Sequence, residues 1–192
     1  MLIVGASRGV GSYAVQIAKS FASLVSAVCS AKKADFVRSL DSDEIIDYSQ
    51  QDFTKTGKLY NPFFVIGGSR SIIDYRCALK PNGIYIFAGR SVRQDFSATI
   101  LRPLHIIRVS QEKDSFLAKP NQGDYDQLIK LSEAGKLTPA IDKHYPRSEV
   151  PDALRYYRDG KVKGKIVITL DHDKKLSCRL RALRWQRNAR SL

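Results

Sequence analysis

The sequence predicts an α/β protein built on a parallel sheet with helices on both faces. Three observations lead to this class. Short β-prone runs alternate with helical segments, a glycine-rich turn joins the first strand to the first helix, and strong turn signals such as Pro81-Asn82-Gly83 separate later elements. This alternation is typical of parallel strands that are connected by helices crossing the faces of the sheet.

The first eleven residues, MLIVGASRGVG, hold the most informative pattern. Residues 2–4 form a short apolar strand, and apolar residues recur at helical spacing from Val10 onward. Between them, Gly5, Gly9 and Gly11 allow a tight strand-to-helix turn. The backbone N–H groups of such a turn can face a pyrophosphate at the positive end of the helix. We therefore expect a nucleotide-binding βαβ unit.

The remaining elements follow from hydrophobic runs and turn signals. We expect strands at residues 24–29, 44–47, 61–66, 84–88 and 165–170, and helices at 33–40, 71–79, 125–134 and 148–158. Apolar residues between Ile100 and Val109 indicate a further strand, which Pro103 interrupts. Ser148 is the expected cap of the last helix, and Pro151 falls in its first turn.

Composition limits the class of protein. The 192 residues are 43% hydrophobic and 27% charged, which is typical of a soluble protein with one good core, or one domain and part of another. No apolar run is long enough for a bilayer, and no signal peptide is recognisable. We expect a cytoplasmic protein without a membrane partner. Because Met1 directly begins the first strand, we also expect a truncated reading frame.

Cysteine and histidine residues predict no metal site. The three cysteines, Cys29, Cys77 and Cys178, are odd in number and far apart, and the three histidines have no ligand spacing. The net charge of +13 would suit nucleic acid, but residues 171–192 alone hold seven basic residues against two acidic ones. We expect this tail to be disordered or loosely helical, and we do not expect a nucleic-acid partner.

The end of the second strand bears on the choice of cofactor. A carboxylate there would hydrogen-bond the adenosine ribose of NAD, but the sequence continues with Ser30, Ala31, Lys32 and Lys33. A hydroxyl and two cations suit a 2′-phosphate. The pattern favours NADPH over NADH, although two solvated lysines at a helix start are an alternative reading.

These segments resemble one family. GASRGVGSYAVQIAKSF from Gly5, AVCSAKKADFVRSLDSDEIIDYSQQDF from Ala27, LKPNGIYIFAG from Leu79 and the stretch from Leu131 to Leu170 are similar to the zinc-independent quinone oxidoreductases of the medium-chain dehydrogenase/reductase superfamily, which carry the label zinc-binding dehydrogenase. The resemblance implies a Rossmann-type NADP-binding domain at residues 1–122, the C-terminal segment of a GroES-like catalytic domain at 123–170, and the basic tail.

The resemblance also implies a function and a site. Family members pass hydride from NADPH to a quinone, enone or similar small-molecule acceptor, and they form homodimers. The matching cofactor-binding positions are Gly5, Ala6, Ser7, Arg8, Gly9, Val10, Gly11, Ser30, Lys33, Tyr48, Gly67, Gly68, Ala88, Gly89 and Lys165. No catalytic residue can be named, because the N-terminal part of the catalytic domain is missing. Arg8 departs from the family, which normally has glycine there.

Two other interpretations compete with this one. Gly5, Gly9 and Gly11 also fit the turn of short-chain dehydrogenases, and Tyr157 with Lys161 has their YxxxK spacing. Gly160 argues against that family, because it should end the helix on which both side chains would lie. The other interpretation is a non-catalytic module that binds NADPH but lacks oxidoreductase activity.

Overall fold

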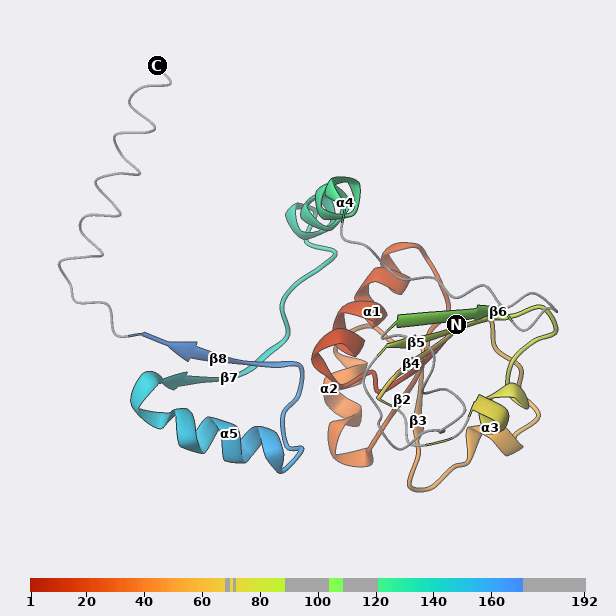
Figure 1. Ribbon diagram of the computed structural model, residues 1–192, viewed down its shortest axis with the longest axis horizontal. Coiled ribbons are helices and arrows are strands. Elements are labelled where there is room, and N and C mark those ends of the chain that lie inside the picture. Colours follow the sequence, from red (N-terminus) through yellow and green to blue (C-terminus); the bar gives the residue numbers. More distant parts are fainter. Residues whose placement is uncertain (68–69, 71, 89–103, 109–120, 171–192) are drawn as a thin grey trace, which may run out of the picture. The chain divides into compact units, whose positions relative to one another are not determined.

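A computed structural model (Figure 1) describes residues 1–67, 70, 72–88, 104–108 and 121–170. The described residues fall into two compact units. The first comprises those within residues 1–140 together with 163–165, and the second includes residues 141–162 and 166–170. The basic tail lies outside the described residues. The expected domain boundaries after residues 122 and 170 stay predictions.

In the first unit, six strands form one sheet in the order β3-β2-β1-β4-β5-β6. Strands β1 to β5 pair in parallel, and β6 pairs antiparallel to β5. The order reverses beside β1, so the loops after β1 and β4 leave the sheet in opposite directions. The strands are β1 (Leu2–Val4), β2 (Ser26–Cys29), β3 (Glu44–Asp47), β4 (Phe63–Ile66), β5 (Ile84–Ala88) and β6 (Leu104–Arg108).

Helices cover both faces of this sheet, as the sequence predicts (Figure 1). Val15 of α1 and Val37 of α2 pack against one face with Ile3. Tyr75 of α3 packs against the other face with Leu2 and Phe63. The helices are α1 (Gly9–Ser20), α2 (Ala34–Arg38) and α3 (Ile72–Arg76), with short 3-10 helices at Ala31–Lys33 and Phe53–Lys55.

Aromatic rings fill the α3 face of the sheet. The fully buried ring of Phe63 has its centroid 5.3 Å from that of Tyr75, 5.9 Å from that of Tyr85 and 6.1 Å from that of Phe53. Rings at these spacings contribute favourable edge and face contacts in addition to the burial of apolar area. This face therefore anchors the part of the sheet from which the loop after β4 departs.

Helix α4 (Gln122–Glu133) belongs to the first unit and begins earlier than expected. The reason is Asn121, whose side-chain oxygen accepts the N–H of Asp124 at 2.9 Å and so caps the helix. Gly135, at φ 69°, follows the helix end as expected. No described helix is long and apolar enough to cross a membrane.

In the second unit, α5 (Val150–Arg158) lies next to a two-stranded sheet of β7 (Ile141–Pro146) and β8 (Lys165–Thr169). The Tyr156 hydroxyl donates to the Asp142 carboxylate at 2.9 Å. Strand β7 was not expected, because its sequence IDKHYP lacks apolar alternation. The expectation that Ser148 caps α5 is wrong: Ser148 lies inside a 3-10 helix, Arg147–Glu149, that precedes α5.

The other expected elements of the first unit appear with shifted ends. Strand β2 is shorter than expected at its start, and α3 is shorter at both ends. The expected helix at 33–40 divides into a 3-10 turn and α2. The expected strand near Pro103 is β6, which begins directly after this proline. Its antiparallel pairing is the one departure from the parallel sheet among the described strands.

Helix α1 approaches β1 closely, and Gly11 makes this approach possible. A Cβ atom at residue 11 would collide with the Gly5 carbonyl oxygen and would lie 2.8 Å from the Ala6 Cα. Both neighbours are backbone atoms of the buried turn, so neither can move without shifting β1 or α1. At Gly9, by contrast, the nearest atoms belong to the flexible end of the Lys165 side chain.

We predict that Gly11→Ala lowers the free energy of unfolding by roughly 3 kcal/mol, because the added methyl group overpacks a backbone contact. Gly9→Ala is the matched control and should change stability far less, because the Lys165 side chain can move aside. Urea unfolding followed by circular dichroism measures both. Equal stability of the two variants would contradict this account of the turn.

An ion pair holds the segment after β4. Arg70 Nη1 lies 2.9 Å from Asp52 Oδ1 and 3.3 Å from Thr54 Oγ1, and its guanidinium lies over the Phe53 ring at 5.7 Å. The Thr54 hydroxyl, and then Arg70, lower the pKa of Asp52 to about 2. Asp52 is therefore ionised at neutral pH and ties the β3–β4 connection to Arg70, three residues after Gly67.

Because the pKa of Asp52 is lower in the folded protein than in the unfolded chain, its stabilisation is present above about pH 4 and is lost as pH falls toward 2. We predict that Asp52→Asn is less stable than wild type at neutral pH, and that this difference shrinks as pH falls below about 4. Urea unfolding at a series of pH values measures it. The control is Asp35→Asn, whose 97%-exposed carboxylate should have little effect. A difference that stays constant with pH would contradict the prediction.

Candidate functional site

The glycine-rich turn lies where the strand order reverses. It leaves the carboxyl end of β1 between the loops that follow β2 and β4. Gly5, at φ 83°, donates its N–H to the Val28 carbonyl at 3.1 Å and accepts the N–H of Arg8 at 3.1 Å. Crevices at this point in parallel sheets bind nucleotides. Ala6 and Ser7 are buried in the turn, and Val10 is about half exposed.

The first turn of α1 is open to an anion. Arg8 occupies the cap position in an extended conformation without a side-chain cap, and the first turn holds no acidic residue. The N–H groups of residues 9–11 have no acceptor within the helix, because the first N–H groups of any helix lack one. These groups, with the partial positive charge of the helix end, suit a phosphate.

Lys165 lies over this helix end. A Cβ atom at Gly9 would be 2.7 Å from the Lys165 Nζ, so the ammonium group occupies the space that glycine leaves. Backbone hydrogen bonds hold Lys165 there: Gly164 donates to the Ser7 carbonyl at 3.0 Å, and Lys165 donates to the Ala140 carbonyl at 2.9 Å. Two segments that are far apart in the sequence thus meet at the turn.

The structure brings Ser30, Lys33 and Tyr48 to the same edge of the sheet. Lys33 donates its N–H to the Ser30 carbonyl at 2.9 Å, and Tyr48 donates its N–H to the carbonyl of Cys29, the last residue of β2, at 3.2 Å. Ser30 and Lys33 are half-buried, whereas the Tyr48 side chain is 59% exposed. These three residues therefore lie at the ends of neighbouring strands, β2 and β3.

Asp47, which the sequence analysis did not single out, positions this edge. It ends β3 directly beside Cys29, and its carboxylate accepts the N–H and the hydroxyl of Ser49 at 3.0 and 2.8 Å. These bonds, with a further one from the Ala31 N–H, keep the pKa of Asp47 below its ordinary value. The carboxylate thus holds the turn that carries Ser30 and Lys33. Its signal in the sequence is an acidic residue at the end of the strand expected at residues 44–47.

The loops at the other side of the crevice are described in part. Gly67, at φ 62°, directly follows β4 and donates its N–H to the carbonyl of Ala88 at 3.2 Å. Ala88 ends β5 and is nearly buried. Gly68 and Gly89, which the resemblance also implies, lie outside the described residues. The cofactor roles of all these positions stay predictions.

Tyr157 and Lys161 do not form the arrangement that a short-chain dehydrogenase needs. Gly160, at φ 68°, ends α5 before Lys161, and the Lys161 ammonium pairs with the Asp159 carboxylate at 2.9 Å. Tyr157 is 66% exposed on the helix. The helix end that Gly160 predicts is therefore present, and it separates the two side chains.

The described residues offer no metal centre, and Cys29 offers no thiolate. Within them, no group of three or more His, Cys, Asp or Glu side chains lies close enough to hold a metal ion. Burial raises the pKa of Cys29 to about 11, so its thiol stays protonated at neutral pH. A catalytic zinc does not fit the donor groups of this part of the chain.

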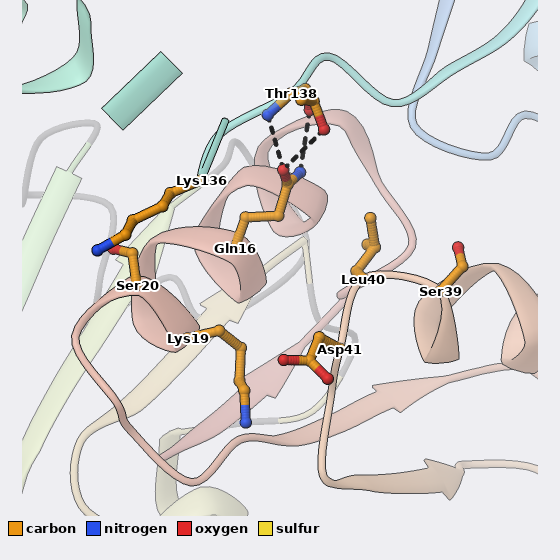
Figure 2. A pocket seen from close by; sticks show the side chains of 8 residues that line it. All are labelled: Gln16, Lys19, Ser20, Ser39, Leu40, Asp41, Lys136 and Thr138. Carbon is orange, nitrogen blue, oxygen red and sulfur yellow. Dashed lines mark hydrogen bonds between the residues drawn. The ribbon is translucent and has the colours of Figure 1, made fainter. Parts of the chain in front are cut away.

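A groove at the far end of α1 is distinct from the turn (Figure 2). There the Gln16 side chain donates to the Thr138 carbonyl at 3.1 Å and accepts the Thr138 N–H at 2.8 Å. Lys19 lines the groove and is paired with Asp43 at 2.8 Å. These bonds attach the segment before β7 to α1. Ala140, two residues after Thr138 in this segment, accepts the Lys165 N–H, so the same bonds help to place Lys165.

Comparisons with known proteins agree with this geometry. The chain is 30% identical over 190 residues to the mitochondrial NAD(P)H oxidoreductase RTN4IP1 of Mus musculus, covering 88% of this chain and 47% of that protein. It is 30% identical over 185 residues to a chloroplast envelope quinone oxidoreductase homolog of Arabidopsis thaliana, covering 88% and 51%. The chain thus spans about half the length of these curated relatives.

Solved structures and a family model give the same result. The quinone oxidoreductase structure from Coxiella burnetii matches with a TM-score of 0.63 and 25% identity, covering 87% of this chain and 51% of that one. A family model described as zinc-binding dehydrogenase matches residues 40–168. The chain therefore belongs to the zinc-binding dehydrogenase family, within the medium-chain dehydrogenase/reductase superfamily.

Proposed function

We propose that this chain is an NADPH-dependent oxidoreductase of the quinone oxidoreductase type, which transfers hydride to a quinone, enone or similar acceptor. The observation that carries the proposal is the open N-terminus of α1, with the Lys165 ammonium over Gly9, at the point where the strand order reverses. The names of the relatives, NAD(P)H oxidoreductase and quinone oxidoreductase homolog, support the same chemistry.

The preference for NADPH rests on Ser30 and Lys33. The two residues lie together at the carboxyl end of β2, where the 2′ position of an adenosine ribose is expected. A hydroxyl and an ammonium group would bind a 2′-phosphate. Asp47, at the end of β3, accepts from Ser49 through Oδ1, and its buried Oδ2 has no hydrogen-bond partner among the described residues. Tyr48 would lie against the adenosine.

When bound, the nicotinamide would supply the hydride. The residues of this chain would hold and orient the dinucleotide: the turn and Lys165 at the pyrophosphate, and Gly67 and Ala88 near the nicotinamide end. Hydride transfer depends on positioning more than on acid or base groups. No step is assigned to zinc, because the described residues offer no donor set for it.

A second candidate is a module that binds NADPH without turnover. Both candidates predict nucleotide binding, and only the first predicts oxidation of NADPH. A homodimer and a cytoplasmic location stay predictions. The names of two relatives place those proteins in the mitochondrion and the chloroplast envelope.

The test is calorimetric titration of the full chain with NADPH and NADH. We predict that wild type binds NADPH more tightly, and that Lys33→Glu weakens NADPH binding by about tenfold or more while NADH binding changes little, because only NADPH carries the 2′-phosphate. Lys130→Glu on α4 makes the same change of charge on an exposed residue and is the matched control.

Each other outcome has a definite meaning. Equal binding of the two nucleotides by wild type would remove the NADPH preference, and binding of neither would overturn the proposed function. Consumption of NADPH with a soluble benzoquinone, followed by absorbance, separates the two candidates. Turnover supports the oxidoreductase, and tight binding without turnover supports the binding module.

A further inference from the structure

The Arg8 side chain crosses the crevice where the strand order reverses. Arg8 belongs to the turn after β1, and its guanidinium reaches the loop after β4: a Cβ atom at Gly67 would lie 2.6 Å from Arg8 Nη1. Gly67 therefore leaves the space that the guanidinium occupies. Because β1 and β4 are neighbours in the sheet, Arg8 lies directly across the crevice in which a dinucleotide would cross from one half of the sheet to the other.

The backbone at Arg8 accommodates this side chain without strain. Its φ and ψ of −88° and 166° are ordinary extended values, so no glycine is required at this position. The residue is exposed, and none of the ion pairs found within the described residues includes it. The charge is thus presented to the crevice and is not neutralised by a neighbouring carboxylate of that part of the chain.

Two cationic side chains consequently flank the N-terminus of α1. Lys165 fills the space over Gly9, and Arg8 fills the space over Gly67. A planar guanidinium binds two oxygens of a phosphate group at once, whereas an ammonium group acts as a point charge. The Arg8 guanidinium can therefore bind two oxygens of a pyrophosphate, and the Lys165 ammonium adds a second positive charge beside the helix end.

We propose that the Arg8 side chain contacts the pyrophosphate of the dinucleotide. With glycine at this position the backbone would approach the pyrophosphate closely; here the guanidinium makes the contact instead. The inference rests on the proposed function, because it assigns a residue to the same nucleotide. Arg8 raises the affinity for NADPH and for NADH by the same factor, since both nucleotides carry the pyrophosphate.

The experiment compares wild type, Arg8→Gln, Arg8→Lys and Arg8→Gly by calorimetric titration with NADPH, NADH and inorganic pyrophosphate. We predict that Arg8→Gln weakens both nucleotides by the same factor of about ten and weakens pyrophosphate as well. Arg8→Lys should retain part of the affinity. The loss should become smaller as ionic strength rises, because exposed charges are screened. Arg158→Gln, which removes an exposed arginine of α5, is the matched control.

The alternative outcomes are distinguishable. Unchanged or tighter nucleotide binding by Arg8→Gln and Arg8→Gly would overturn this inference, because Arg8 would then be neutral or an obstruction, while the proposed function would stand. Failure of wild type and of all three variants to bind either nucleotide would overturn the proposed function together with the inference. Thermal unfolding of each variant shows whether a loss of binding reflects a loss of fold.

Discussion

The close approach of α1 to β1 at Gly11 is the constraint on which the rest of the site depends. The contact between the helix backbone and the Gly5 carbonyl aims the helix N-terminus at the carboxyl edge of the sheet. The same turn provides the Ser7 carbonyl that receives Gly164, which places Lys165. A tight packing requirement at one glycine therefore determines where the positive end of the helix and a cationic side chain meet.

Charge at this edge is arranged for an anion. The helix end, Arg8 and Lys165 surround the turn, and Lys33 stands at the end of the neighbouring strand. Two carboxylates of the described residues, at the end of β3 and after it, have partners: Asp47 accepts from Ser49 through Oδ1, and Asp52 pairs with Arg70. Part of the positive charge of this basic chain therefore has a defined place in the fold.

Local patterns were sufficient to predict most of the sheet and its helices. Residues that are neighbours in the sequence determine three of these features: the apolar run of β1, the glycine-rich turn and the end of α5 at Gly160. Strand β7 could not be predicted, because it is a short, polar strand that pairs, among the described strands, with β8 alone. The positions of Arg8 over Gly67 and Lys165 over Gly9 depend on tertiary contacts, which no local pattern contains. Asp47 was missed because it acts from the strand beside β2.

Binding of a dinucleotide's phosphates at the N-terminus of α1 can be observed through amide chemical shifts. On titration of the labelled full chain with NADPH, we expect the amides of Gly9, Val10 and Gly11 to shift strongly, together with those of residues 30–33. The amides around Gln16 and Thr138, which lie at the other groove (Figure 2), should shift little. Shifts confined to that groove, or no shift at the turn, would contradict the account.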